Sequence, residues 1–153
     1  LLGSAAMSTE AIADRLRDAG LRATATRVAV LQVLTEARDH PRVDQVIARV
    51  RASGLDISTQ AGYDVCEALQ RVSLARRIAP AGGPTRYEAR VGDNHHHLVC
   101  RGCGRAVDVD CATGSAPCLD LPHHHGFVLD EAEVTFWGFC PDCQATSNEG
   151  TAA

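Results

Sequence analysis

Two Cys-x-x-Cys pairs constrain the fold of this chain more than any other feature. Cys100 and Cys103 form the first pair, and Cys140 and Cys143 form the second after 36 intervening residues. Each pair holds two thiolates about one turn apart, so two pairs can complete a tetrahedral site for structural Zn²⁺. A redox-active pair would need a thioredoxin-like βαβ context, in which a single pair is sufficient. We therefore predict a closed four-cysteine zinc site that stabilises a small fold and leaves no open position for a substrate.

The composition limits the class of protein. With 153 residues, of which 45% are hydrophobic, the chain can form one ordinary domain or two small ones. Seven cysteines, an odd number, without a secretory signal favour a reducing compartment, and we expect a cytoplasmic protein. No apolar run approaches the ~20 residues of a transmembrane helix, so we expect no membrane partner. We interpret residues 1–6, before the single methionine Met7, as a remnant of an expression vector.

Charge is distributed unevenly along the chain, whose net charge is −4 at pH 7. Residues 1–90 contain 13 arginines and 10 acidic residues, whereas residues 91–153 contain 2 arginines and 9 acidic residues. A basic half joined to an acidic half suggests that the first half meets a polyanion while the second half has another role.

Helix signals dominate the first half. Ser8, Thr24 and Ser58 are N-cap residues, and each precedes a segment with apolar residues at helical spacing. Pro41 suits the first position of a further helix, which lies between the second and the last of these. The pattern therefore predicts four short helices before residue 73.

A β-hairpin is predicted after these helices. Residues 75–79 and 85–91 are short alternating segments that flank a Gly-Gly-Pro turn. Helices followed by a hairpin form a winged helix-turn-helix, so we predict a DNA-binding domain over residues 7–91. Its fourth helix would enter the major groove, and Arg76 and Arg77 of the hairpin would lie near phosphate. The alternative is a small helical domain with a solvated arginine-rich hairpin.

The second half has the pattern of a small α/β unit over residues 92–144, so the predicted fold class of the whole chain is α+β. Residues 96–99, 105–109 and 128–137 have the pattern of strands, and residues 145–153 have that of a disordered tail. The roughly 60 residues that follow residue 91 bury too little apolar surface for much independent stability, so this half needs a metal, a partner or both.

A histidine cluster precedes the first cysteine pair. His95 and His97 alternate along a predicted strand and share one face, and Asp108 lies in the next strand, where antiparallel pairing would bring its carboxylate close. Imidazole and carboxylate ligands suit Fe²⁺, Mn²⁺, Ni²⁺ or Zn²⁺. Histidines are also common on surfaces, so the motif alone leaves a second metal site and a solvated cluster both open.

Several motifs together resemble the ferric uptake regulator (Fur) family. The resemblance covers residues 9–144 and rests most specifically on the block that runs from His95-His96-His97 to Cys100-x-x-Cys103-Gly104. It also rests on Leu21-Arg22-Ala23-Thr24-x-x-Arg27, His40-Pro41, Ile57-Ser58 with Tyr63, Arg86-Tyr87-Glu88, Gly126-Phe127 and Gly138-Phe139-Cys140-x-x-Cys143.

This resemblance implies a homodimeric, metal-dependent transcriptional repressor and not an enzyme. The four cysteines would hold the structural zinc, and a regulatory ion, Fe²⁺ or Mn²⁺, would lie between the two domains. Purified protein could carry Zn²⁺ at the regulatory site instead. The DNA partner would be a palindromic double-stranded operator. The residues implied for the regulatory site are His40, Glu88, His95, His97 and Asp108.

The resemblance is to the FurA/CatR type, whose members respond to peroxide and regulate catalase genes. An aspartate at position 108 is also the choice of peroxide-sensing relatives. Peroxide would release the repressor through iron-driven oxidation of a site histidine or through oxidation of Cys111 and Cys118, which lie outside the two cysteine pairs. Two alternatives remain: a regulator of iron, zinc or nickel supply, and a metalloenzyme that uses the histidines to activate water.

The predicted recognition helix departs from the family pattern. It reads Ser58-Thr59-Gln60-Ala61-Gly62-Tyr63-Asp64, with Ala and Asp where the family usually has Thr and Arg. Asp64 repels phosphate but can accept a hydrogen bond from cytosine N4, so the operator would differ from the usual one. Gly62 weakens the helix by about 1 kcal/mol relative to alanine. The predicted DNA contacts are Tyr63, Gln60, Arg22, Arg76 and Arg77.

Overall fold

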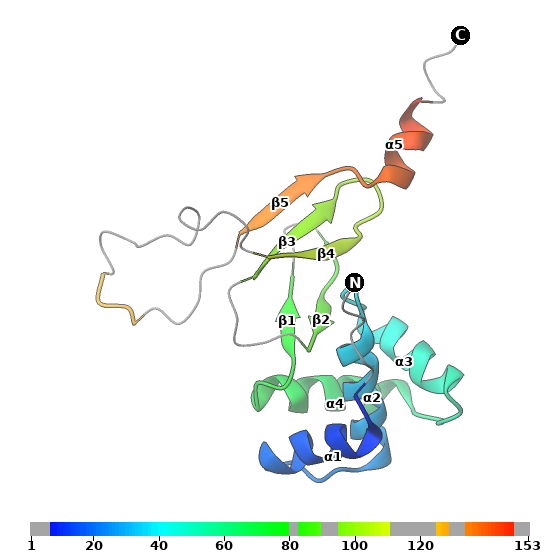
Figure 1. Ribbon diagram of the computed structural model, residues 1–153, viewed down its shortest axis with the longest axis vertical. Coiled ribbons are helices and arrows are strands. Elements are labelled where there is room, and N and C mark those ends of the chain that lie inside the picture. Colours follow the sequence, from blue (N-terminus) through cyan, green and yellow to red (C-terminus); the bar gives the residue numbers. More distant parts are fainter. Residues whose placement is uncertain (1–6, 80–82, 90–94, 111–124, 129–133, 149–153) are drawn as a thin grey trace. The chain divides into compact units, whose positions relative to one another are not determined.

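The fold is known from a computed structural model that describes residues 7–79, 83–89, 95–110, 125–128 and 134–148. The chain divides into two compact units, residues 1–91 and residues 92–153. The described part of the first unit contains helices and a two-stranded hairpin, and that of the second contains a three-stranded sheet and one helix (Figure 1). The predicted α+β class is therefore confirmed.

The described part of the first unit contains four helices, and each predicted N-cap is present. Ser8, Thr24 and Ser58 accept a hydrogen bond on their side-chain oxygen from the backbone N–H three residues later. These bonds satisfy amide groups that the first turn of a helix leaves without a partner. The helices are α1 (Thr9–Asp18), α2 (Ala25–Glu36), α3 (Val43–Ala52) and α4 (Thr59–Arg71).

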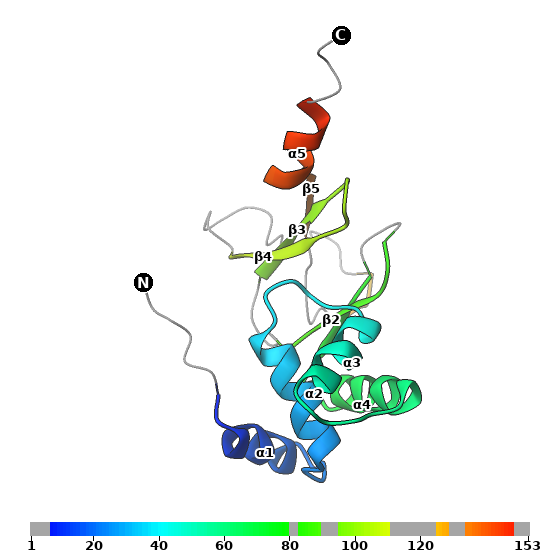
Figure 2. The same cartoon turned by 90° about the vertical axis from the view of Figure 1, so that its right-hand side faces the viewer.

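Helix α2 lies at the centre of this unit. It contacts α1, α3 and α4, among which it lies in both views (Figures 1 and 2). A helix with neighbours on several sides must be apolar around most of its circumference, and Val30, Leu31 and Leu34 are fully or almost fully buried. The core is completed from the other helices by Ile12, Leu16, Val46, Val50, Cys66 and Leu69.

Helix α3 begins two residues later than predicted. Pro41 lies before the helix, and Arg42 is the N-cap residue. The Pro41 carbonyl accepts a hydrogen bond from the backbone N–H of Tyr87 at 3.0 Å, and the Arg42 backbone N–H donates to the side chain of Gln45 at 2.9 Å. The first contact holds Pro41 against a strand, so the helix begins only after it.

Gly62 allows α4 to pack closely on α3. A Cβ atom at position 62 would lie 2.6 Å from Cδ1 of Ile47, a distance at which one of the two must move. Glycine at this position lowers the helix propensity of α4, but it lets α4 approach α3 closely.

The hairpin consists of β1 (Arg76–Ile78) and β2 (Arg86–Glu88), paired antiparallel. Arg76 faces Glu88 in this register, and Ile78 faces Arg86. Strand β1 contacts α4, and β2 contacts α2, so the hairpin is attached to the helical core on both strands. The predicted hairpin is confirmed, with strands shorter than the predicted segments.

In the second unit, β3 (His95–Cys100) lies between β4 (Ala106–Asp110) and β5 (Thr135–Gly138). It pairs antiparallel with β4 and parallel with β5. The first two strands agree with the prediction, whereas the third begins at Thr135 and not at residue 128. Residues 129–133, within the predicted strand, lie outside the described residues.

Helix α5 (Pro141–Asn148) follows the sheet. It includes residues 145–148, which we expected to belong to a disordered tail. Proline at the first helical position and Asp142 in the first turn favour its start, and Cys143 ties that turn to the other cysteines. No helix in the described ranges is long and apolar enough to cross a membrane.

Candidate metal centres and nucleic-acid surface

The parallel pairing of β3 with β5 brings the two cysteine pairs together. Cys100 ends β3 opposite Gly138 of β5, and the backbone N–H of Arg101 donates to the Gly138 carbonyl at 2.7 Å. Two residues beyond Gly138, the backbone N–H of Cys140 donates to the Sγ atom of Cys100 at 3.2 Å. The strand register thus places the start of the second pair directly beside the first.

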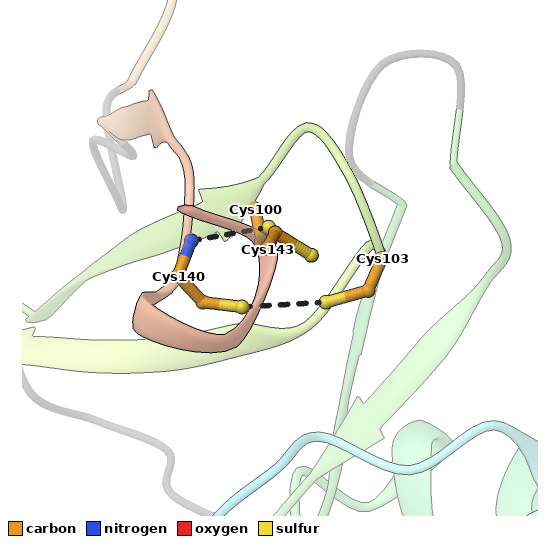
Figure 3. Close-up of side chains that lie close together, drawn as sticks. All are labelled: Cys100, Cys103, Cys140 and Cys143. Atoms are coloured by element: carbon orange, nitrogen blue, oxygen red, sulfur yellow. Dashed lines mark hydrogen bonds between the residues drawn. The ribbon is translucent and has the colours of Figure 1, made fainter. Parts of the chain in front are cut away.

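All four cysteine side chains converge (Figure 3). Their Sγ atoms lie within 4.8 Å of one another, and those of Cys103 and Cys140 are 3.8 Å apart. A tetrahedron with Zn–S bonds of ~2.3 Å has S···S edges of about 3.8 Å, so the spacing fits that ion. A Cβ atom at Gly102 would lie 2.8 Å from the Sγ atom of Cys143, and only glycine leaves room there.

The electrostatics of this four-cysteine cluster favour a bound cation. Backbone N–H groups, first that of Cys140, lower the pKa of the Cys100 thiol to about 6. Hydrogen bonding with the neighbouring sulfurs, first that of Cys140, raises the pKa of the Cys143 thiol to about 12. One thiolate therefore forms readily and opposes ionisation of the next. A divalent cation removes that repulsion, so metal binding would release protons.

Two of the predicted regulatory residues meet in the first unit. The Nε2 atom of His40 lies 2.8 Å from Oε2 of Glu88, and both side chains are buried. His40 has a φ of +47°, a strained value for a residue other than glycine, and it precedes Pro41. Its carbonyl accepts a hydrogen bond of 3.0 Å from the buried guanidinium of Arg86. Strand β2 of the hairpin thus supplies both the Glu88 carboxylate and the Arg86 guanidinium that holds the backbone of His40.

The other three predicted regulatory residues meet in the second unit. His97 lies directly opposite Asp108 across the β3–β4 pair, as antiparallel pairing predicted. The Nε2 atoms of His95 and His97 lie 3.6 Å and 3.7 Å from the same oxygen, Oδ1 of Asp108. These separations are too long for good hydrogen bonds and suit atoms that share a cation. His96 projects to the other face, where its ring meets that of Phe136.

Each unit therefore gathers part of an imidazole–carboxylate ligand set. The first unit contributes one imidazole and one carboxylate, and the second contributes two imidazoles and one carboxylate. Such donors fit Fe²⁺ and Mn²⁺, which prefer nitrogen and oxygen, better than they fit ions that require thiolates.

Most of the predicted DNA contacts are accessible. Tyr63 is 52% exposed on α4, and Gln60, Arg22 and Arg77 are exposed as well. A pocket of about 490 Å³ lies between α4 and the hairpin. It is lined by Tyr63, Glu67, Gln70, Arg71, Arg77 and Tyr87.

Arg76 is the exception among these residues. Its guanidinium is 16% exposed and lies 3.7 Å from the Glu88 carboxylate, so it faces inward and not toward a DNA backbone. The alternation of the strand could have indicated this, because Arg76 shares a face with the buried Ile78. Arg77, on the opposite face, donates to Thr85 at 3.3 Å and remains the hairpin's accessible arginine.

Among the described residues, one cysteine lies outside the four-cysteine cluster. Cys66 of α4 is buried, and burial raises the pKa of its thiol to about 11, which keeps it neutral and unreactive near pH 7. Cys111 and Cys118, predicted as a possible redox pair, lie outside the described residues. The support that Arg86 gives to His40 could not be predicted from the sequence, because no local pattern indicates a contact across 46 residues.

Comparison with known proteins gives a consistent result. The model of the ferric uptake regulator family matches residues 18–137. Transcriptional regulator FurA of Mycobacterium tuberculosis is 54% identical over 131 residues, which cover 86% of this chain and 88% of that protein. Ferric uptake regulation protein 2 of Mycolicibacterium fortuitum is 49% identical over 140 residues, which cover 90% of this chain and 96% of that protein. Peroxide-responsive repressor PerR of Staphylococcus aureus is 25% identical over 135 residues, which cover 88% of this chain and 90% of that protein.

Solved structures share the fold. The ferric uptake regulator of Helicobacter pylori matches with a TM-score of 0.65 and 18% identity, over 91% of this chain and 95% of that one. The peroxide stress regulator of Campylobacter jejuni matches with a TM-score of 0.62 and 21% identity, over 90% and 99%.

Proposed function

Because this chain belongs to the ferric uptake regulator family of metal-dependent transcriptional regulators, we propose that it is a peroxide-responsive repressor of catalase-type oxidative-stress genes. Family membership confirms the resemblance found in the sequence and rules out the metalloenzyme alternative. Proteins of this family bind DNA and are dimeric. The observation that carries the peroxide role is the 54% identity to a FurA regulator, supported by a weaker match to a peroxide-responsive repressor.

The four-cysteine cluster is proposed to hold one structural Zn²⁺ per chain. Its sulfur spacing, its closed ligand set and the small size of the second unit support this assignment. A fully coordinated zinc leaves no position for peroxide or substrate, so this ion stabilises the fold and does not report a signal.

The regulatory ion is proposed to be Fe²⁺ or Mn²⁺, held jointly by the two partial ligand sets. His40 and Glu88 would come from the first unit, and His95, His97 and Asp108 from the second. Neither set alone supplies the five or six donors that these ions favour, whereas together they do. An ion shared in this way would couple metal occupancy to the arrangement of the DNA-binding unit.

Release by peroxide is proposed to occur at the regulatory site. His40, Glu88, His95, His97 and Asp108 would hold the Fe²⁺, which would supply one electron to cleave the O–O bond of peroxide. One peroxide oxygen would leave as hydroxide, and the other would be taken up by a neighbouring imidazole ligand. His95 and His97 lie close enough to one oxygen of Asp108 that a change in either would disturb the whole set. The alternative route, oxidation of Cys111 and Cys118 to a disulfide, would leave the histidines intact.

The dimer is proposed to bind a palindromic operator in the cytoplasm, with α4 of each chain in one half-site. Two-fold symmetry in a dimer is matched by two-fold symmetry in its site. In the second unit, Leu98 and Phe136 are neighbours across β3 and β5 and are 41% and 44% exposed. An exposed apolar patch in the half of the chain that carries the acidic excess suits contact with protein and not with DNA.

The decisive experiment compares peroxide release from protein loaded with Fe²⁺ and with Mn²⁺. An operator would first be located by footprinting the DNA that adjoins the gene, and its binding followed by fluorescence anisotropy. Peroxide should release the Fe²⁺ form, and mass spectrometry should find one added oxygen on His40, His95 or His97. Mn²⁺ keeps the geometry without the same peroxide chemistry, so the Mn²⁺ form should stay bound.

A Cys111→Ser, Cys118→Ser double variant separates the two release routes. If it still responds with Fe²⁺ and not with Mn²⁺, the histidine route is supported. Loss of the response, with metal and DNA binding intact, would assign release to the thiols. If peroxide has no effect in any form and metal removal alone releases the DNA, the protein is instead a regulator of metal supply.

A further inference from the structure

The exposed surface of α4 contains a contact between two side chains one helical turn apart. The Nε2 atom of Gln60 donates to Oδ1 of Asp64 at 2.8 Å, and both side chains are exposed. They flank Tyr63, itself 52% exposed, on the N-terminal half of the helix. In a helix-turn-helix domain the N-terminal residues of the recognition helix are those that contact base edges.

This contact determines what the helix offers to DNA. A glutamine amide normally presents both a donor and an acceptor, which suits adenine. Here one N–H of Gln60 is occupied by Asp64, and the carboxylate of Asp64 has no donor of its own. The pair therefore presents mainly acceptor atoms, with one negative charge.

The major groove has only two donors, the amino groups of cytosine N4 and adenine N6. Adenine N6 lies between two acceptors that repel a carboxylate, its own N7 and thymine O4, whereas cytosine N4 has such a neighbour, guanine O6, on one side only. Resting on the proposed DNA-binding function, we propose that Asp64, held in place by Gln60, reads a cytosine in each half-site. This pair is then a determinant of operator specificity and does not contribute to general affinity.

The charges on the same helix support a specific role for Asp64. A carboxylate near the phosphate backbone lowers affinity for every sequence, so an unpaired acidic residue there has a cost without a benefit. Glu67, three residues later, is neutralised by Arg71 at 2.6 Å. Asp64 instead accepts a hydrogen bond from the Gln60 amide, which orients the carboxylate and leaves its charge in place.

The test is selection of operators from a randomised duplex library by the Mn²⁺-loaded full-length protein. Wild-type protein should enrich a C·G pair in each half-site, and replacing that pair by T·A should weaken binding about 5- to 100-fold, the range of one good base contact. Asp64→Asn, which replaces one acceptor oxygen by an amino group, should select sites without that cytosine. Glu67→Gln is the matched control, because it removes the same charge from the same helix and should keep the cytosine.

The outcomes are distinguishable. If Asp64→Asn selects the same sites as wild type, or strengthens binding to all sites as Glu67→Gln does, the carboxylate acts only through its charge and the proposal is wrong. A wild-type selection without a C·G preference in either half-site also overturns it, whatever the variants do. If wild-type protein enriches no sequence at all, the proposed DNA-binding function itself has failed.

Discussion

The guanidinium of Arg86 donates to the backbone carbonyl of His40 across 46 residues of sequence, and both side chains are buried. The next residue of the strand, Tyr87, donates its backbone N–H to the carbonyl of Pro41. The two contacts hold the His40–Pro41 segment against β2 and compensate the strained φ of His40. The same short strand ends with Glu88, so the hairpin fixes the distance between a histidine and a carboxylate of the proposed regulatory site.

Arg86→Lys should therefore weaken regulatory metal binding without unfolding the protein. Lysine keeps the charge but loses the planar fork that reaches a carbonyl, and loss of such a supporting contact typically costs 10- to 100-fold in metal affinity. Titration with Mn²⁺, followed by operator binding, would measure the change. Arg71→Lys, on an exposed arginine, is the control and should have no effect. Equal Mn²⁺ affinities for Arg86→Lys and wild type would show that His40 needs no such support.

Gly62→Ala should destabilise the first unit, although alanine is the better helix former. The gain in propensity is about 1 kcal/mol, whereas crowding of Ile47 against a new Cβ typically costs 1–3 kcal/mol. Urea unfolding would report the net change. Ile47→Ala removes both Cγ1 and Cδ1 and so makes room, and Gly62→Ala, Ile47→Ala should therefore be more stable than the sum of the two single changes predicts. If the changes in the free energy of unfolding of the two single variants simply add in the double variant, the helices move apart without cost.

Cys66 should resist alkylation in the folded protein and react once the protein unfolds. Burial raises the pKa of its thiol to about 11, above the ~8.5 of an exposed cysteine. The unfolded chain therefore loses this proton first, and the free energy of unfolding should fall as the pH rises from ~8.5 toward 11. Urea unfolding at pH 8 and pH 9.5 should show a smaller fall for Cys66→Ala than for wild type. A similar fall in both proteins would show that other groups titrate in this range.

Cys140→Ser should abolish zinc binding and, with it, the fold of the second unit and the dimer. Cys140 contributes a sulfur 3.8 Å from that of Cys103 and a backbone N–H to Cys100, so serine disrupts one ligand in a closed set. Metal analysis together with light scattering would measure both losses. Cys66→Ser is the matched control, because it removes a thiol that lies outside the cluster. Retention of one zinc per chain by Cys140→Ser would exclude the four-cysteine assignment.

Local signals predicted local features of this chain. The N-caps at Ser8, Thr24 and Ser58 depend on a side chain and an amide three residues apart, so sequence spacing is sufficient to find them. Asp108 was found as a neighbour of His97 because a two-residue period and one antiparallel pairing determine both faces. The cysteine cluster followed from spacing and ligand chemistry alone.

Features that depend on distant contacts were not predictable in this way. Helix α3 begins at Val43 because the Pro41 carbonyl is engaged by β2, a contact that no pattern around Pro41 reveals. Gly62 looked unfavourable until Ile47 of another helix was placed beside it. The inward orientation of Arg76, by contrast, could have been predicted from the alternation of β1, but its basic charge led to its assignment as a DNA contact.

Strand β3 carries ligands of both proposed ions, with His97 only three residues, or about 10 Å, from Cys100. The same ladder to β5 pairs His97 with Thr135 and Cys100 with Gly138, next to the second cysteine pair. Cys100 and Cys103 also lie at the start of the turn between β3 and β4, so a closed zinc cluster would help to hold the register in which His97 faces Asp108. If the proposed ions occupy these sites, we expect a newly made chain to need zinc before its regulatory site can bind an ion. A cell starved of zinc would then lose the regulator's response to its second ion, however abundant that ion is.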